Sequence, residues 1–89
     1  MTIPEPLSPV VVTWFDSTSR EQWDTQENHL EWWKNHHNMI TTVGIFIAYR
    51  HHTYVIARDR TLIDDEPYLS GVMFIPEHSV LQMEPLPYR

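Results

Sequence analysis

Residues 39–60 read MITTVGIFIAYRHHTYVIARDR and carry the clearest structural signal in the chain. The first half alternates β-branched and aromatic residues with smaller or polar ones, and a second β pattern resumes at residues 54–57. The polar interruption between the two halves predicts a β-hairpin with His51 and His52 at or near its tip. No Asn-Gly pair marks this turn, so its type stays open.

Further β patterns lie on both sides of this hairpin. Residues 10–16 read VVVTWFD and carry apolar side chains on both faces, which indicates a strand covered on both sides. Residues 68–76 read YLSGVMFIP and predict another strand, from which a tight turn leads into a last strand at residues 80–83. The TLIDDEP segment at residues 61–67 is the predicted loop before them.

Residues 16–38 read DSTSREQWDTQENHLEWWKNHHN. In this stretch the spacing of the apolar residues changes from that of a β-strand to that of a helix. Their spacing predicts a short helix at about residues 25–34. Two pairs of residues can act as a capping box at its start: Ser19 with Gln22, and Asp24 with Glu27.

The spacing leads to specific predictions for four large apolar residues of this helical segment. Trp23, Leu30 and Trp33 share one helical face, which is predicted to lie on the sheet and to make Trp23 a core residue. Truncating Trp23 to alanine would then cost about 3 to 5 kcal/mol. Trp32 and Trp33 are about 100° apart on a helix, so one of the two is expected to be partly exposed.

Strands joined in this order predict a mainly β fold with one short α-helix, in the form of a small, bent, five-stranded barrel. Gly44 and Gly71 lie inside predicted strands, where glycine marks a bulge, a bend or a close backbone approach. Residues 1–9 contain three prolines and predict an extended Pro-rich arm. Residues 10–89 form the single barrel domain, into which the helix is inserted.

The composition limits the classes of function. The chain has 89 residues, no cysteine and a formal net charge of −6. A core this small favours self-association, so we expect a homo-oligomer. The acidic charge argues against direct nucleic-acid binding. The missing cysteines and the lack of an apolar run argue for a cytoplasmic protein with no membrane contact.

The whole pattern resembles a set of small, mostly uncharacterised proteins encoded by bacteriophages and prophages. The matching pieces are residues 12–17, 30–32, 42–47, 54–57 and 71–86. The resemblance implies a phage origin and a small barrel with an Ile-Pro turn like that of Sm-like or SH3-like proteins. It implies no activity, and Glu77 and His78 depart from the basic residues that usually follow the Ile-Pro turn in such proteins.

No residue pattern indicates catalysis, a cofactor or a metal. The six histidines include two adjacent pairs, and neighbouring residues seldom both reach one zinc ion. Metal acquired adventitiously by these histidines stays open. A Ser-His-Asp arrangement would lack the glycine elbow that exposes a serine nucleophile. The chain is therefore expected not to be an enzyme.

The predicted binding site combines one tryptophan with the polar segment after the first strand. Its residues are Trp32, Trp14, Asp16, Ser17 and Arg20. An indole face, hydroxyl groups and one cation suit a residue of a protein partner or a stacked nucleobase. The function expected is a non-enzymatic phage accessory protein of counter-defence type, which binds a host protein or sequesters a nucleotide-type signalling ligand. The alternative is a structural or assembly component of the phage particle.

Overall fold

A computed structural model describes residues 3–16, 19–36 and 38–86 of the protein. The strands are β1 (Pro9–Asp16), β2 (Asn38–Arg50), β3 (Thr53–Ile63), β4 (Glu66–Pro76) and β5 (Val80–Pro85). Helix α1 (Gln26–His36) lies between β1 and β2, and the 3-10 turn η1 (Glu77–Ser79) lies between β4 and β5. The prediction of a mainly β protein with one short helix is confirmed over these residues.

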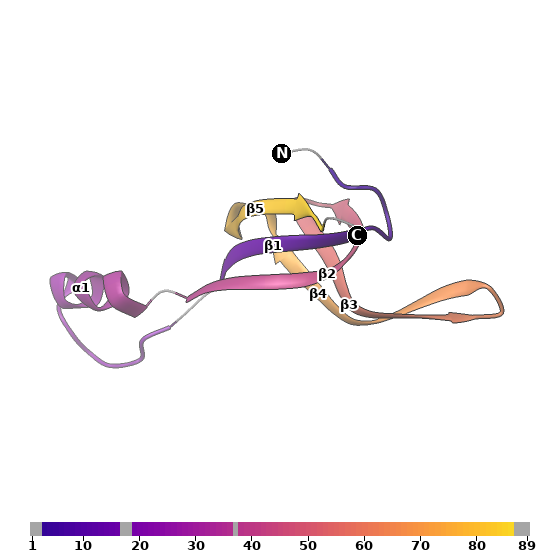
Figure 1. The fold of residues 1–89 in the computed structure, drawn as a ribbon. Helices are drawn as coiled ribbons and strands as arrows, with labels where there is room; N and C mark the ends of the chain where they lie inside the picture. Colours follow the sequence, from indigo (N-terminus) through magenta and orange to yellow (C-terminus); the bar gives the residue numbers. More distant parts are fainter. Residues whose placement is uncertain (1–2, 17–18, 37, 87–89) are drawn as a thin grey trace.

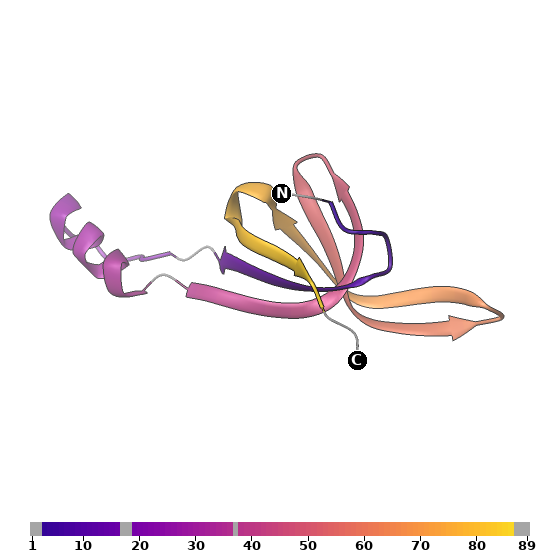
Figure 2. The ribbon, with the colours of Figure 1, turned by 45° about the horizontal axis from the view of Figure 1, so that its top comes forward.

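The strands of the described residues form one five-stranded antiparallel sheet in the order β4-β3-β2-β1-β5. Its two edges, β4 and β5, are connected in sequence through η1 but form no ladder with each other in the described chain. The sheet is strongly bent, as Figure 2 shows, yet it stays open. The predicted SH3/Sm-like barrel is therefore wrong in its closure, because the two edge strands lack the hydrogen bonds that would join them.

The buried side chains gather on the concave face of this bent sheet. The fully enclosed cluster consists of Val10, Val12, Phe46, Tyr54, Ile56, Ile75 and Met83. Val10 and Val12 alternate with half-buried Val11 and Thr13, so β1 is fully covered on one face rather than on both. Trp14, Tyr49, Met73 and Val80 pack around the cluster.

Both internal glycines occupy positions that another residue would strain. A Cβ atom on Gly44 would lie 2.6 Å from Cγ2 of Ile56 and 2.7 Å from the carbonyl oxygen of Ala57. The expected close backbone approach is thus present at Gly44. Gly71 has a φ of 66° and lies where the β3–β4 hairpin leaves the rest of the sheet. Only glycine adopts such a backbone conformation without steric cost.

Both long hairpins turn through two residues in the left-handed region. His51 and His52 have φ values of 51° and 57°, and Asp64 and Asp65 have values of 53° and 64°. Positive φ at both central residues defines the type I′ turn, whose twist matches that of the flanking strands. The predicted histidine tip is confirmed. The predicted loop at residues 61–67 is wrong, because the strands continue up to the two aspartates.

Residues 3–8 of the predicted Pro-rich arm return to the sheet of their own chain. The backbone N–H of Leu7 donates to the carbonyl of Phe46 over 2.6 Å, and the N–H of Phe46 donates to the carbonyl of Ser8 over 2.9 Å. Pro9 already belongs to β1. This end of the segment therefore extends the pairing of β1 with β2.

Two parts of the chain project from opposite ends of the sheet, as Figure 1 shows. One is the helix arm, residues 19–36, and the other is the hairpin arm, residues 58–71. Trp23 is 101% exposed, and Leu30 and Trp33 remain more than half exposed. The prediction that these residues cover the sheet is wrong, because the bent sheet already covers its own concave face. The expected partial exposure of Trp32 or Trp33 is confirmed, and Trp33 is the more exposed of the two.

Candidate functional site

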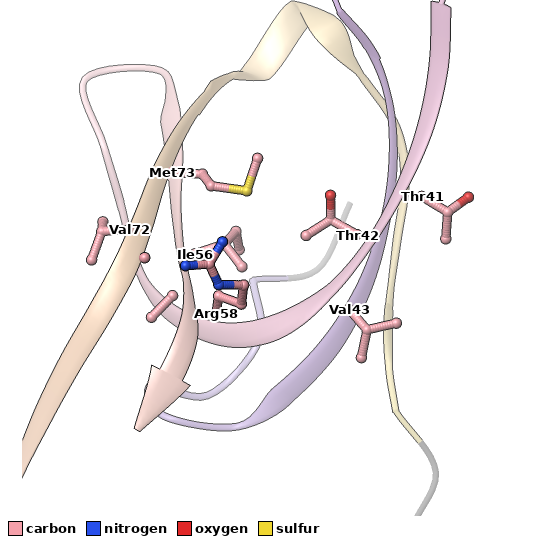
Figure 3. A pocket seen from close by; sticks show the side chains of 9 residues that line it. Thr41, Thr42, Val43, Ile56, Arg58, Val72 and Met73 are labelled. Atoms are coloured by element: carbon pink, nitrogen blue, oxygen red, sulfur yellow. The ribbon is translucent and has the colours of Figure 1, made fainter. Parts of the chain in front are cut away.

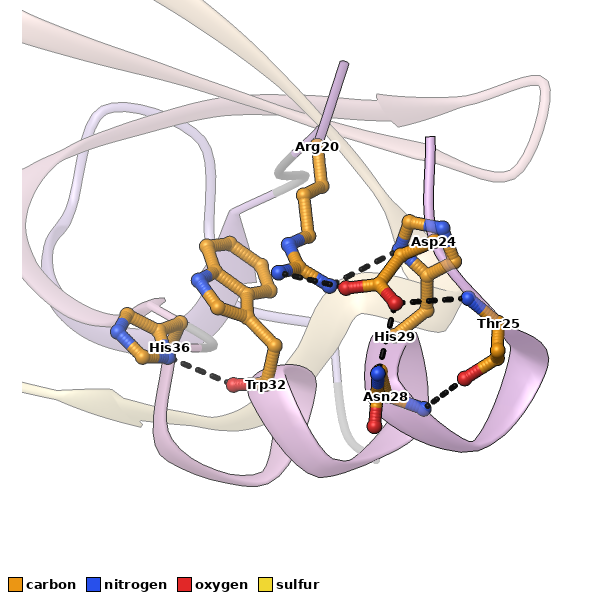
Figure 4. Close-up of polar contacts among 7 residues, drawn as sticks. All are labelled: Arg20, Asp24, Thr25, Asn28, His29, Trp32 and His36. Atoms are coloured by element: carbon orange, nitrogen blue, oxygen red, sulfur yellow. Dashed lines mark hydrogen bonds and ion pairs between the residues drawn. The ribbon is translucent and has the colours of Figure 1, made fainter. Parts of the chain in front are cut away.

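The structure brings Trp32 and Arg20 together on the helix arm, as Figure 4 shows. The guanidinium carbon of Arg20 lies 5.5 Å from the centroid of the indole ring. The imidazole of His36 stacks on the same indole with centroids 4.3 Å apart and planes 2° from parallel. His36 Nδ1 also lies 2.6 Å from the carbonyl oxygen of Trp32. The half-buried indole is thus in contact with two side chains of its own arm.

Arg20 links the segment before the helix to the helix itself. One of its nitrogens lies 3.3 Å from the Asp24 carboxylate and another lies 3.2 Å from Nδ1 of His29. Because a guanidinium can only donate, Nδ1 of His29 accepts and the ring hydrogen is assigned to Nε2. The Nε atom of Arg20 is buried and has no hydrogen-bond partner among the described residues. This cluster therefore fixes the geometry of the arm around Trp32.

The start of α1 is capped by Thr25, which neither predicted capping box includes. The Thr25 hydroxyl accepts the backbone N–H of Asn28 over 3.1 Å, and the Thr25 carbonyl accepts the first helical N–H from His29. Asp24 accepts the Asn28 side-chain amide over 2.7 Å and the Thr25 N–H over 2.8 Å. These two hydrogen bonds, with that of Asn28 the stronger cause, hold the pKa of Asp24 below its ordinary value.

Two other predicted site residues, Trp14 and Asp16, lie on β1 and not on the helix arm. Trp14 lies on β1, packs against the core and donates its indole N–H to the hydroxyl of Thr42 over 3.1 Å. Asp16 ends β1 with an exposed side chain that interacts with other residues. Ser17 lies outside the described residues. Of the five predicted residues, Trp32 and Arg20 are the two seen in direct contact.

The histidines that the structure describes do not converge on a metal. Among residues 3–16, 19–36 and 38–86, no group of three or more histidine, aspartate or glutamate side chains could hold an ion. His52 instead lies 3.3 Å from the Glu77 carboxylate at the end of the β2–β3 hairpin. Hydrogen bonds from Tyr49, the larger cause, and from His52 lower the pKa of Glu77. The same contact with Glu77 raises the pKa of Tyr49.

The structure contains a groove that the sequence did not indicate. It has a volume of about 460 Å³ and lies where β2 and β3 separate, as Figure 3 shows. Its walls come from three strands: residues 41–43 of β2, 56–58 of β3 and 71–73 of β4. We call it the β2–β3 fork. No periodicity in the sequence marks it, because it exists only where the pairing of two strands stops.

The described part of the chain contains no helix long and apolar enough to cross a membrane. No family model, curated protein or solved structure matches this chain. The resemblance to phage-encoded proteins therefore stays a prediction.

Proposed function

We propose that this protein is a non-enzymatic structural subunit that assembles with copies of itself. The observation that carries the proposal is the shape of the chain. Its radius of gyration is 16.6 Å and its extents are 57 × 26 × 23 Å. A compact domain of the same length has a radius of gyration of about 12 Å. A shape this extended exposes surface that a separate small domain would cover.

The side chains of the two arms support the same proposal. The helix arm exposes Trp23, Leu30 and Trp33, and the hairpin arm exposes Leu62, Ile63 and Tyr68, each of them more than half accessible. Apolar side chains concentrated on projecting segments are typical of surfaces that become buried on association. In an oligomer, these residues supply the core area that a chain of 89 residues lacks.

The arrangement around Trp32 favours this role over the sequestering of a nucleotide-type ligand. A ligand of that kind would stack on an open indole face. Trp32 already contacts His36 by ring stacking and Arg20 through its guanidinium group. A ligand would have to displace these groups. The resemblance to bacteriophage proteins is compatible with assembly into a phage particle.

Sedimentation velocity over a wide range of protein concentrations tests the proposal. We expect species larger than the 10.7 kDa monomer, with the average mass increasing with concentration. Native mass spectrometry of the same samples would give the number of subunits. A dissociation constant of about 100 μM corresponds to a binding free energy of about 5 kcal/mol, which is weak association. A single 10.7 kDa species at every concentration up to about 100 μM would therefore overturn the proposed function.

A further inference from the structure

The β2–β3 fork presents two strand edges without a neighbouring strand in the described chain. β2 pairs with β3 only from Ile45↔Ala57 to Arg50↔Thr53. Beyond that point β2 stays paired with β1, and β3 stays paired with β4 as far as Ile63↔Glu66. The unpaired edges are therefore residues 38–44 and 58–63. Edges of this kind form hydrogen bonds readily with an added strand.

The chemistry of the fork specifies what it can bind. Threonine and apolar side chains line it, and Arg58 is the one charged residue among them. Figure 3 shows the guanidinium group in the opening between β4 and β2. Arg58 pairs with Asp59 over 3.3 Å, but both side chains are well exposed, at 75% and 60%. An exposed pair contributes at most about 1 kcal/mol, so Arg58 can exchange Asp59 for another carboxylate.

The end of the hairpin arm has the complementary chemistry. Its turn carries three consecutive acids, Asp64, Asp65 and Glu66, which we call the acidic tip. All three are exposed and make no ion pair within the described part of the chain. Ile63, beside them, is 51% exposed. The tip can therefore offer carboxylates to Arg58 and an apolar side chain to the walls of the fork.

The acidic tip cannot reach the fork of its own chain. Arg58 and Gly71 are at the base of the hairpin arm, whereas the acids are at its far end. A strand rises about 3.3 Å per residue, so the five residues from 58 to 63 separate base and tip by about 17 Å. A tip that enters a fork must therefore come from a second copy of the chain.

We propose that the acidic tip of one copy docks in the β2–β3 fork of the next. Its carboxylates bind Arg58, and its strand adds to an open edge of the fork. Because each copy carries both surfaces, the contact can repeat in one direction, which makes it heterologous and joins the subunits head to tail into a ring or a filament. This interface rests on the proposed function, because it specifies how the copies assemble.

Two variants that each remove one side of the contact test the interface. Arg58→Glu reverses the charge of the fork and leaves the tip intact. The triple variant Asp64→Asn, Asp65→Gly, Glu66→Gln removes the charge of the tip and leaves the fork intact, and Asn-Gly is favoured in a type I′ turn. We expect each variant alone to associate at least about tenfold more weakly than the wild type, since charge pairs of this kind contribute more than 1.4 kcal/mol.

Mixing the two variants tests directly whether the tip of one chain enters the fork of another. The intact tip of Arg58→Glu can enter the intact fork of the triple variant, but neither chain can bind further. The mixture should therefore give a discrete 1:1 dimer in native mass spectra. Arg50→Glu reverses a charge, and the double variant Glu5→Gln, Glu84→Gln removes two negative charges, at exposed positions outside both arms and the fork. Both controls should associate like the wild type.

Each remaining outcome decides between the two proposals. Variants that associate like the wild type would overturn the interface while the self-assembly stands. Variants that fail both alone and as a mixture would overturn the pairing of tip with fork. A wild-type chain that stays monomeric would overturn the proposed function as well. Circular dichroism and urea unfolding of every variant check that its fold is unchanged, and Arg58→Ala replaces Arg58→Glu if the charge reversal unfolds the chain.

Discussion

The two halves of β3 differ in burial although they belong to one continuous strand. In residues 53–57, which pair with both β2 and β4, Tyr54, Ile56 and Ala57 are at most 2% exposed. In residues 58–63, which pair with β4 alone, every side chain is exposed. The comparison teaches that this strand is buried only where a third strand pairs with it, and the sequence changes from apolar residues to Arg58, Asp59 and Arg60 at the same point.

Truncating one apolar residue in each half gives the largest expected difference. Ile56→Ala should lower the free energy of unfolding by about 2 to 5 kcal/mol, because Ile56 is enclosed in the core cluster. Leu62→Ala should change it by less than about 0.5 kcal/mol, because the side chain is 59% exposed. Urea unfolding of dilute protein measures both. Similar losses in the two variants would contradict the division of the strand.

The two glycines extend the comparison to the backbone. Gly44→Ala should cost about 1 to 3 kcal/mol, because the new Cβ would meet the Ala57 carbonyl, which cannot move aside cheaply. In Gly71→Ala the new Cβ would meet the Arg58 side chain, and alanine would be strained at a φ of 66°. This strain lies at the base of the exposed arm and not in the core. We expect its effect on global unfolding to be smaller. A larger loss for Gly71→Ala would show that the hairpin arm unfolds together with the core.

The two type I′ turns allow the same test with stabilising changes. His51→Asn with His52→Gly should raise the free energy of unfolding by about 1 kcal/mol, since non-glycine residues are strained in the left-handed region. That value already includes the small loss from removing the exposed ion pair between His52 and Glu77. Asp64→Asn with Asp65→Gly should raise amide-exchange protection within residues 58–71 and leave global stability nearly unchanged. An equal global gain from both would argue against independent opening of the arm.

Trp23 tests the helix arm in the same way. Trp23→Ala should change the free energy of unfolding by less than about 0.5 kcal/mol, in place of the 3 to 5 kcal/mol expected from the sequence, because the side chain is fully exposed. Dilute, monomeric protein is required, since Trp23 could be buried on assembly. A loss of several kcal/mol in the free energy of unfolding of the monomer would show that Trp23 belongs to the core.

The smallest expected effect is the response of the helix start to pH. The pKa of Asp24 is lowered in the folded chain, so its hydrogen bonds contribute stability above the ordinary value of 3.8. That contribution is lost as the pH falls through the lower, folded value. Proton NMR should show the Thr25 backbone amide and the Asn28 side-chain amide shifting together below pH 4. Asp24→Asn should abolish this pH-dependent change in the amide shifts. An unchanged response in that variant would show that another group causes it.

The candidate site was predictable only in part. The spacing of Trp32 on a helix and the nearby Arg20 indicated two residues that the structure does bring together. The stacking of His36 on Trp32 could not be read from the residues, because an i, i+4 pair can point in several directions before its rotamers are known. The β2–β3 fork could not be predicted from the sequence. The residues that line it come from three strands, and the register between those strands does not follow from the residues of any one of them.

The sequence by itself determined most of the secondary structure of this protein, although it predicted a loop at residues 61–67 where two strands continue. Alternating β-branched residues indicated the strands at residues 10–16 and 43–49, and polar residues marked the histidine turn and the helix start to within one or two positions. These features depend on neighbours along the chain. Only the tertiary structure decided that the sheet stays open and that Trp23 faces solvent. Burial and strand pairing depend on segments distant in sequence, and their positions are set by the fold as a whole.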